Sequence, residues 1–221
     1  MTTRKQHDHD HDDEEAPSGR MPELMDEHGP IWVNKFTEDS ARAFVKQLQF
    51  QSRQDQASPI IIYIDSNGGE AYALLTMIAA MESVPNQIIT CALSKAMSAG
   101  VMLLACGDIR YACEHATLMV HEVSAGTGGH IDDIQTQHVN ITKLNDKLLK
   151  LFVKKCNFKG GVVALKKMLS GQRDLYLTAE EGQKLGVVHH IGIPTLYKNL
   201  SVEYTLSSNP RGQHGVSKAK D

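Results

Sequence analysis

The sequence predicts an α/β fold with a mainly parallel sheet, on three observations. The run 60–64 (Ile-Ile-Ile-Tyr-Ile) is apolar at nearly every position, which is typical of a strand covered by helices on both faces. Strand-like runs alternate with segments of helical apolar periodicity, a rhythm that favours right-handed crossovers between parallel strands. The 221 residues are 41% hydrophobic, which is enough for one domain with a sizeable core.

The first half of this rhythm is readable element by element. Residues 31–33 indicate a short strand, and the apolar stripe within 41–48 indicates a helix. The buried strand over 60–64 leads into a turn at 65–69 (Asp-Ser-Asn-Gly-Gly), and the apolar periodicity of 71–81 predicts the next helix.

The second half continues the alternation. We expect strands over 88–92, 109–112 and 117–120, and a helix over 98–106. The longest periodic segment, 131–155, predicts a helix of about 35 Å. Part of that helix either projects and packs against another subunit or lies on the core of its own chain, and the pattern leaves both open.

The two ends of the chain differ from the middle in composition. Residues 1–28 are acidic and rich in histidine, and we expect a disordered arm there, a domain over 29–196 and a polar tail over 197–221. Alternating His and Asp in the arm can also bind a divalent metal, but a solvated tail is the preferred interpretation. We expect no metal and no cofactor at the site of chemistry.

Composition excludes several classes of function. A net charge of −3 gives no basic field for nucleic acid. The longest apolar stretch near a helix, 96–106, is too short to span a bilayer, and the sequence shows no secretory signal. Three of the four cysteines lie in core-like runs and show no paired metal spacing, so we expect reduced thiols in a cytoplasmic protein.

Three residues in separate segments have the types needed for acyl transfer. Ser98 lies where a strand gives way to an apolar helix, His121 closes the apolar run 117–120, and Asp174 precedes a capping box at 178–181. A serine needs a general base, and the base needs a group that orients it. The sequence therefore predicts a Ser98, His121 and Asp174 triad.

Each member of this triad also has a simpler interpretation. Ser98 can be a helix N-cap, His121 a core histidine and Asp174 an ordinary loop carboxylate. Lys95 offers a rival Ser–Lys pair, although its offset from Ser98 is not the usual Ser-x-x-Lys arrangement.

The adjacent glycines Gly68 and Gly69 follow a buried strand. Glycine permits backbone conformations in which an N–H points at an oxyanion, and the helix start after Ser98 offers the N–H of Ala99 for the same purpose. A phosphate-binding turn lacks the remaining motif spacing, and a plain tight turn stays open.

These segments together resemble the proteolytic subunits (ClpP) of the caseinolytic, or Clp, protease family, from about 31 to 193. The resemblance is carried by 64–69 (Ile-Asp-Ser-Asn-Gly-Gly), 97–100 (Met-Ser-Ala-Gly), 118–121 (Leu-Met-Val-His) and 173–181 (Arg-Asp-Leu-Tyr-Leu-Thr-Ala-Glu-Glu). Their order and spacing agree with the family.

The resemblance implies a crotonase-like spiral of β-β-α units with a projecting long helix. It implies a serine endopeptidase with nucleophile Ser98, base His121, orienter Asp174 and oxyanion donors Gly69 and Ala99. The residues expected beside a peptide or unfolded protein substrate are Gly68, Val123 and Gly126. It further implies two stacked rings of seven subunits, a tetradecamer, joined through the helix at 131–155.

The sequence departs from the family pattern in three places. Asn67 stands where the family usually has proline, and Glu122-Val123 replaces the usual Gln-Pro. The arm stands in place of the family's apolar axial segment, so docking to a Clp-type AAA+ ATPase is left open. Two alternatives remain beside the peptidase, namely a crotonase-type acyl-CoA enzyme and an inactive assembly subunit.

Overall fold

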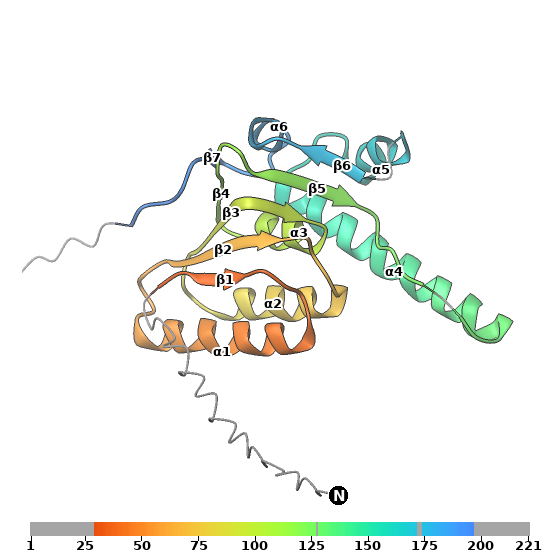
Figure 1. Ribbon diagram of the computed structural model, residues 1–221, viewed down its shortest axis with the longest axis horizontal. Helices are drawn as coiled ribbons and strands as arrows, with labels where there is room; N and C mark the ends of the chain where they lie inside the picture. Colours follow the sequence, from red (N-terminus) through yellow and green to blue (C-terminus); the bar gives the residue numbers. More distant parts are fainter. Residues whose placement is uncertain (1–28, 127, 172–173, 197–221) are drawn as a thin grey trace, which may run out of the picture.

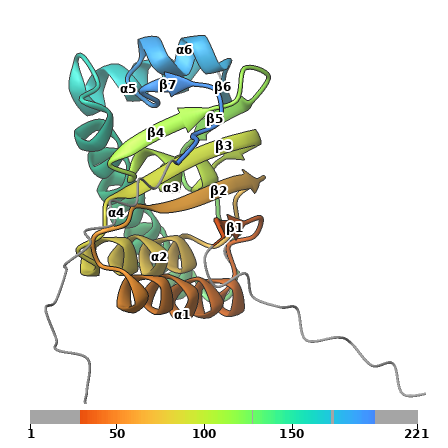
Figure 2. The same ribbon diagram turned by 90° about the vertical axis from the view of Figure 1, so that its left-hand side faces the viewer.

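The computed structural model describes residues 29–126, 128–171 and 174–196. The arm predicted over 1–28 and the tail predicted over 197–221 lie outside the described residues. Within them, the chain forms one seven-stranded sheet with helices packed around it (Figures 1 and 2), and the predicted α/β class is confirmed.

The sheet is parallel apart from one pair of strands. Its order is β1-β2-β3-β4-β7, and β5 pairs with both β3 and β6. Only the β5–β6 pair is antiparallel among the described strands. The strands are β1 (Ile31–Val33), β2 (Ile60–Ser66), β3 (Ile88–Met97), β4 (Ile109–Ala112), β5 (Thr117–His121), β6 (Asp174–Leu177) and β7 (His190–Ile191).

Strand β3 is long, and two strands, β4 and β5, pair with successive parts of it. Its first half pairs with β4, where Ile89 lies opposite Ile109, and its last residues pair with β5, where Met97 lies opposite Met119. The strand therefore runs five residues past the predicted end. The apolar pattern missed this extension because Ser94 and Lys95 interrupt it. The extension carries the chain to Ser98 beside β5.

Side chains along β1 and β2 alternate between buried positions and more exposed ones, so only one face of these strands is fully buried. The other face carries Trp32, which is 64% exposed and packs against Tyr63, and the prediction that the 60–64 strand is covered on both faces is wrong.

In Figure 1, α1 and α2 lie side by side beneath β1 and β2, whereas α5 and α6 lie beside β6. Every residue of α3 is buried, so this helix is the centre of the core. The helices are α1 (Glu38–Gln54), α2 (Ala71–Ser83), α3 (Ala99–Ala105), α4 (Ile131–Cys156), α5 (Gly161–Gly171) and α6 (Ala179–Lys184).

Helix α4, the longest periodic segment, lies on the core at one end and projects at the other. Its C-terminal part is packed in the core through Leu148, Leu149, Phe152 and Cys156. Its N-terminal part extends away from the body of the molecule (Figure 1) and exposes Ile131 and Val139.

The buried side chain of Arg110 hydrogen-bonds to the backbone at three separate segment ends. Its guanidinium donates to the carbonyls of Ala105, Lys155 and Gly186, at 3.3, 3.0 and 3.0 Å. These carbonyls lie at the ends of α3 and α4 and just beyond α6. The side chain therefore satisfies terminal carbonyls that have no partner within a helix.

Three elements, α5, β6 and the two-residue strand β7, were not predicted from the sequence. Helix α5 was not expected, because glycines flank it and it contains β-branched Val162 and Val163; the packing of Leu165 and Leu169 in the core stabilises it. Strand β6, for which the sequence pattern predicts no element, forms because the edge of β5 offers it a hydrogen-bonding partner. The capping box of Thr178 and Glu181 at the start of α6 is present.

Among the described residues, no helix is long and apolar enough to cross a membrane. All four cysteines lie within those residues and are free thiols.

Candidate active site

Ser98 occupies a sharp turn between β3 and α3. Its φ of 54° and ψ of −117° lie in a region that non-glycine residues rarely adopt. The Ser98 N–H donates to the carbonyl of Met119 on β5, at 2.9 Å, and so holds the turn against that strand. The Ser98 side chain makes no capping hydrogen bond to α3, so the N-cap interpretation does not describe what its hydroxyl does.

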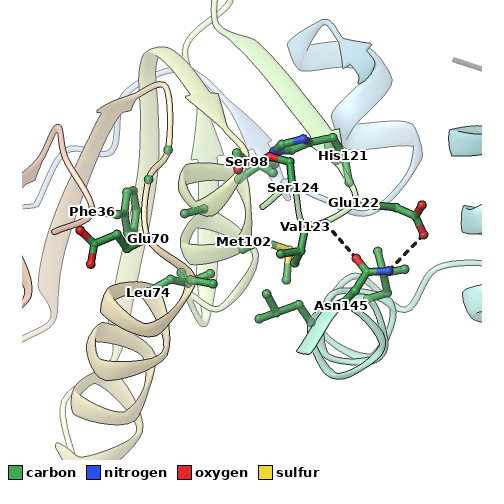
Figure 3. Close-up of a pocket in the computed structure, with 18 of the residues that line it drawn as sticks. Phe36, Glu70, Leu74, Ser98, Met102, His121, Glu122, Val123, Ser124 and Asn145 are labelled. Atoms are coloured by element: carbon green, nitrogen blue, oxygen red, sulfur yellow. Dashed lines mark hydrogen bonds between the residues drawn. The ribbon is translucent and has the colours of Figure 1, made fainter. Parts of the chain in front are cut away.

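The Ser98 hydroxyl instead contacts the imidazole of His121. Oγ of Ser98 lies 2.6 Å from Nε2 of His121, the last residue of β5 (Figure 3). Parallel pairing of β3 and β5 places the ends of the two strands side by side, and each side chain lies at or just beyond a strand end. The geometry therefore joins a strained serine to a potential base.

Asp174 lies opposite His121 across the antiparallel pair of β5 and β6. Its Oδ1 is 3.9 Å from Nδ1 of His121, which is longer than a hydrogen bond. The His121 side chain is 22% exposed and the Asp174 side chain 43% exposed. The structure thus brings the three predicted residues together, with the Ser98–His121 contact closer than the His121–Asp174 contact.

The Gly68-Gly69 turn lies against the Ser98 turn. Gly68 has a φ of +100°, and a Cβ at Gly68 would lie 2.7 Å from Cβ of Ser98 and 3.1 Å from the backbone nitrogen of Ala99. Gly69 has a φ of +151°, and a Cβ there would lie 2.5 Å from the carbonyl oxygen of Phe36. Both positions therefore require glycine.

Within the described residues, the backbone N–H of Gly69 and that of Ala99, the first residue of α3, donate no hydrogen bond. The N–H groups on either side of Gly69 are occupied, since Gly68 donates to Ser66 Oγ and Glu70 donates to the carbonyl of Phe36. The N–H groups of Gly69 and Ala99 are the donors that the resemblance assigns to the oxyanion hole.

A pocket of about 540 Å³ opens beside these groups. Its lining includes Ser98, His121, Gly68 and Val123. The predicted substrate residue Gly126 is exposed, with no atom within 4 Å of a Cβ placed on it, and is not part of the lining. Apolar side chains form much of the wall, namely Leu74, Val101, Met102, Val120, Leu148 and Leu149.

Sequence reasoning missed several polar residues of the lining, and one of them is Asn145 on α4. Its amide accepts from the Val123 N–H and donates to the Glu122 carboxylate (Figure 3). Its only signal in the sequence is an asparagine inside a long helix, where this residue type is a weak helix former.

The rival base Lys95 is otherwise engaged. Its Nζ lies 3.6 Å from Oδ1 of Asp65, and Lys95 does not line the pocket. Across the described residues, no group of three or more His, Cys, Asp or Glu side chains is arranged to hold a metal ion.

Comparison with known proteins gives two results. A family model described as Clp protease matches residues 17–194. The chain is 30% identical over 171 residues to ATP-dependent Clp protease proteolytic subunit 3 of Streptomyces coelicolor, covering 76% of this chain and 77% of that protein. It is also 30% identical over 164 residues to proteolytic subunit 2 of Tropheryma whipplei, covering 73% of this chain and 89% of that protein.

Proposed function

The chain belongs to the Clp protease family, and from this premise we propose that it is a serine endopeptidase acting through Ser98, His121 and Asp174. The family and the helix-covered parallel sheet confirm the predicted crotonase-like α/β fold. The observation that carries the proposal is the 2.6 Å contact between Ser98 Oγ and His121 Nε2 at a serine with positive φ.

In the proposed reaction, His121 Nε2 accepts the Ser98 proton as Oγ attacks a peptide carbonyl. The resulting imidazolium then protonates the leaving amine. Water next attacks the acyl-enzyme, and His121 takes a proton from that water and returns it to Ser98 Oγ as the acid product leaves. The positive φ of Ser98 supports this role, because strained backbone is concentrated at functional sites and a strand-to-helix turn exposes the serine oxygen.

The N–H groups of Gly69 and Ala99 are the proposed oxyanion donors. Their lack of partners in the described part of the chain supports this assignment, as does the position of Ala99 at the start of α3. Loss of one such donor typically costs about 3 kcal/mol of transition-state stabilisation.

Asp174 is the proposed orienter of His121. A carboxylate facing Nδ1 favours the tautomer that leaves Nε2 free to accept the Ser98 proton, and it stabilises the imidazolium. The proposal requires the 3.9 Å distance to shorten by about 1 Å to reach hydrogen-bond length during the reaction.

The proposed substrate is a peptide or unfolded protein with an apolar side chain next to the cleaved bond. The apolar walls formed by Leu74, Met102 and Leu148 support this choice. We also propose that the chain acts as a homo-oligomer of stacked rings that enclose the sites, with exposed apolar residues of α4 such as Ile131 in the contacts. The relatives are named ATP-dependent, and the sequence leaves docking of an ATPase to this chain open.

The test is active-site labelling of the full-length protein with a fluorophosphonate, followed by mapping of the adduct. We expect one adduct, on Ser98, and loss of both adduct and peptidase activity in Ser98→Ala. Labelling of another serine, with activity retained in Ser98→Ala, would refute the proposal. Assembly without labelling would favour the inactive subunit, and binding of an acyl-CoA without peptide hydrolysis would favour the crotonase-type enzyme.

A further inference from the structure

The side chain of Asn145 links α4 to the backbone just beyond His121. Its Oδ1 accepts a hydrogen bond from the N–H of Val123 at 2.9 Å, and its Nδ2 donates to Oε1 of Glu122 at 3.1 Å. Figure 3 shows both bonds crossing from α4 to the segment that borders the pocket. We call this pair of bonds the Asn145 bridge.

The Asn145 bridge lies directly after the last residue of β5 that pairs with another strand. The last β5–β6 pair is His121 with Asp174, and β5 ends at His121. The next residues, 122–124, line the pocket without belonging to any strand. A backbone N–H that leaves a sheet needs another acceptor, and the amide oxygen of Asn145 supplies one for Val123.

The bridge uses both ends of the amide. Asparagine is a poor helix former, yet Asn145 stands within the long helix α4, next to the half-buried Leu144. Its carbonyl and its amino group each bond to a residue more than 20 positions earlier in the chain. The hydrogen-bonding pattern thus fits a side chain that joins two elements.

We infer that Asn145 is a positioning residue that holds the His121 imidazole against Ser98 by fixing the two residues that follow His121. This inference rests on the proposed function. The relevant geometry is a hydroxyl-to-imidazole distance of 2.6 Å, which depends on the orientation of the last residue of β5. Without the bridge, residues 122 and 123 lose their hydrogen bonds to α4, and only the packing of Val123 against the core still holds the C-terminal side of His121.

The first experiment measures the kinetics of fluorophosphonate labelling at Ser98 in the full-length protein. The rate constant reports how well Ser98 is activated, and the final adduct per subunit reports how many sites are folded. We expect Asn145→Ala to lower the rate constant about tenfold, as for the loss of one to two hydrogen bonds, with the same final adduct. Asn140→Ala, an exposed asparagine of the same helix, is the matched control and should label at the wild-type rate.

The second experiment exchanges the donor and the acceptor of the bridge. Asn145→Asp keeps an oxygen for the Val123 N–H but places a carboxylate against that of Glu122, so we expect slower labelling. Adding Glu122→Gln supplies an amide that donates to the new carboxylate, and both bonds can form again. The double variant should therefore label several-fold faster than Asn145→Asp alone, and Glu122→Gln alone completes the cycle.

The outcomes separate this inference from the proposed function. A wild-type rate constant in Asn145→Ala, or a reduced final adduct at an unchanged rate constant, overturns the positioning role and leaves the peptidase proposal intact. Failure of the double variant to recover also counts against the bridge. If the wild-type protein shows no adduct on Ser98, the proposed function and this inference both fall.

Discussion

Asp174 faces His121 across an antiparallel strand pair, yet the two side chains are 3.9 Å apart at their closest polar atoms. Directly opposed residues in such a pair have Cβ atoms about 5 Å apart, which leaves the rest of the distance to side-chain torsions. Because the backbone register already aligns the two residues, the remaining gap lies between side-chain atoms. The sheet therefore fixes the pairing of Asp174 with His121, whereas the distance between their polar atoms depends on side-chain torsions.

This arrangement predicts the effect of removing the carboxylate. We expect Asp174→Ala to lower kcat for an apolar peptide substrate by about 10² to 10⁴-fold, because His121 loses its orienter and the partner of its charged form. KM should change little, since Asp174 does not line the pocket. Steady-state kinetics measures both constants, and a kcat within about threefold of wild type would show that the 3.9 Å distance does not close.

The positive φ of Ser98 predicts a difference in stability between two variants that both lack the hydroxyl. Ser98→Gly and Ser98→Ala both lose the hydroxyl, but only glycine adopts a φ of 54° without strain. We expect Ser98→Gly to have a free energy of unfolding about 1 kcal/mol higher than Ser98→Ala, and both to be inactive. Urea unfolding of the two variants measures the difference, and equal stabilities would argue against strain at this turn.

The contact between two turns predicts a severe effect at Gly68. A Cβ at this position would lie 2.7 Å from Cβ of Ser98 and 2.9 Å from the Met97 carbonyl, and the φ of +100° adds strain. We expect Gly68→Ala to displace Ser98 and to abolish labelling by a fluorophosphonate. Gly171→Ala, where a Cβ meets nothing within 4 Å, should label normally. Normal labelling of Gly68→Ala would show that the turns can separate without loss of reactivity.

The carbonyls bound by Arg110 predict its contribution to stability. Arg110→Met leaves three backbone acceptors at segment ends without their charged donor, and we expect a loss of about 3 kcal/mol or more in the free energy of unfolding. Arg42→Met removes an exposed pair with Glu38 and should cost under about 1 kcal/mol. Denaturant unfolding of both variants provides the comparison, and similar losses would contradict the bridging role of Arg110.

The sequence alone predicted the elements whose apolar pattern is local. Strand β2 and helix α4 each have an apolar pattern that is visible within their own residues. Both are present in the structure within a few residues of the expected bounds. Strand β6 has no such pattern, since its four residues become a strand only through the edge of β5. The sequence therefore indicated Asp174 as a candidate without indicating the strand that aligns it with His121.

The residues of the candidate site also divide into those that a local sequence motif identifies and those that only tertiary packing brings to the site. Ser98, His121 and the two glycines stand in recognisable motifs, so residue type and order suffice to select them. Asn145 has no motif, because its bonds depend on how α4 crosses the end of β5, and only tertiary packing determines that crossing. Gly126 was expected beside the substrate from the family resemblance, and the exposed course of the chain there keeps it out of the pocket lining.

The buried thiols predict how the protein responds to rising pH. Burial raises the pKa of Cys91 to about 12, that of Cys106 to about 11 and that of Cys156 to about 12, whereas only Cys113 is partly exposed. The folded chain thus keeps three thiol protons that the unfolded chain releases above its thiol pKa of about 8.5.

Stability should therefore be constant with respect to these thiols below about pH 8 and fall as the pH rises from about 8.5 toward 11, because the unfolded state then binds fewer protons than the folded state. At about pH 8, an aromatic disulfide reagent should modify at most one thiol per native subunit and four after denaturation. Counting the released aromatic thiolate by absorbance checks this. Rapid reaction of two or more thiols in the native protein would mean that the core around α3 opens far more readily than its complete burial implies.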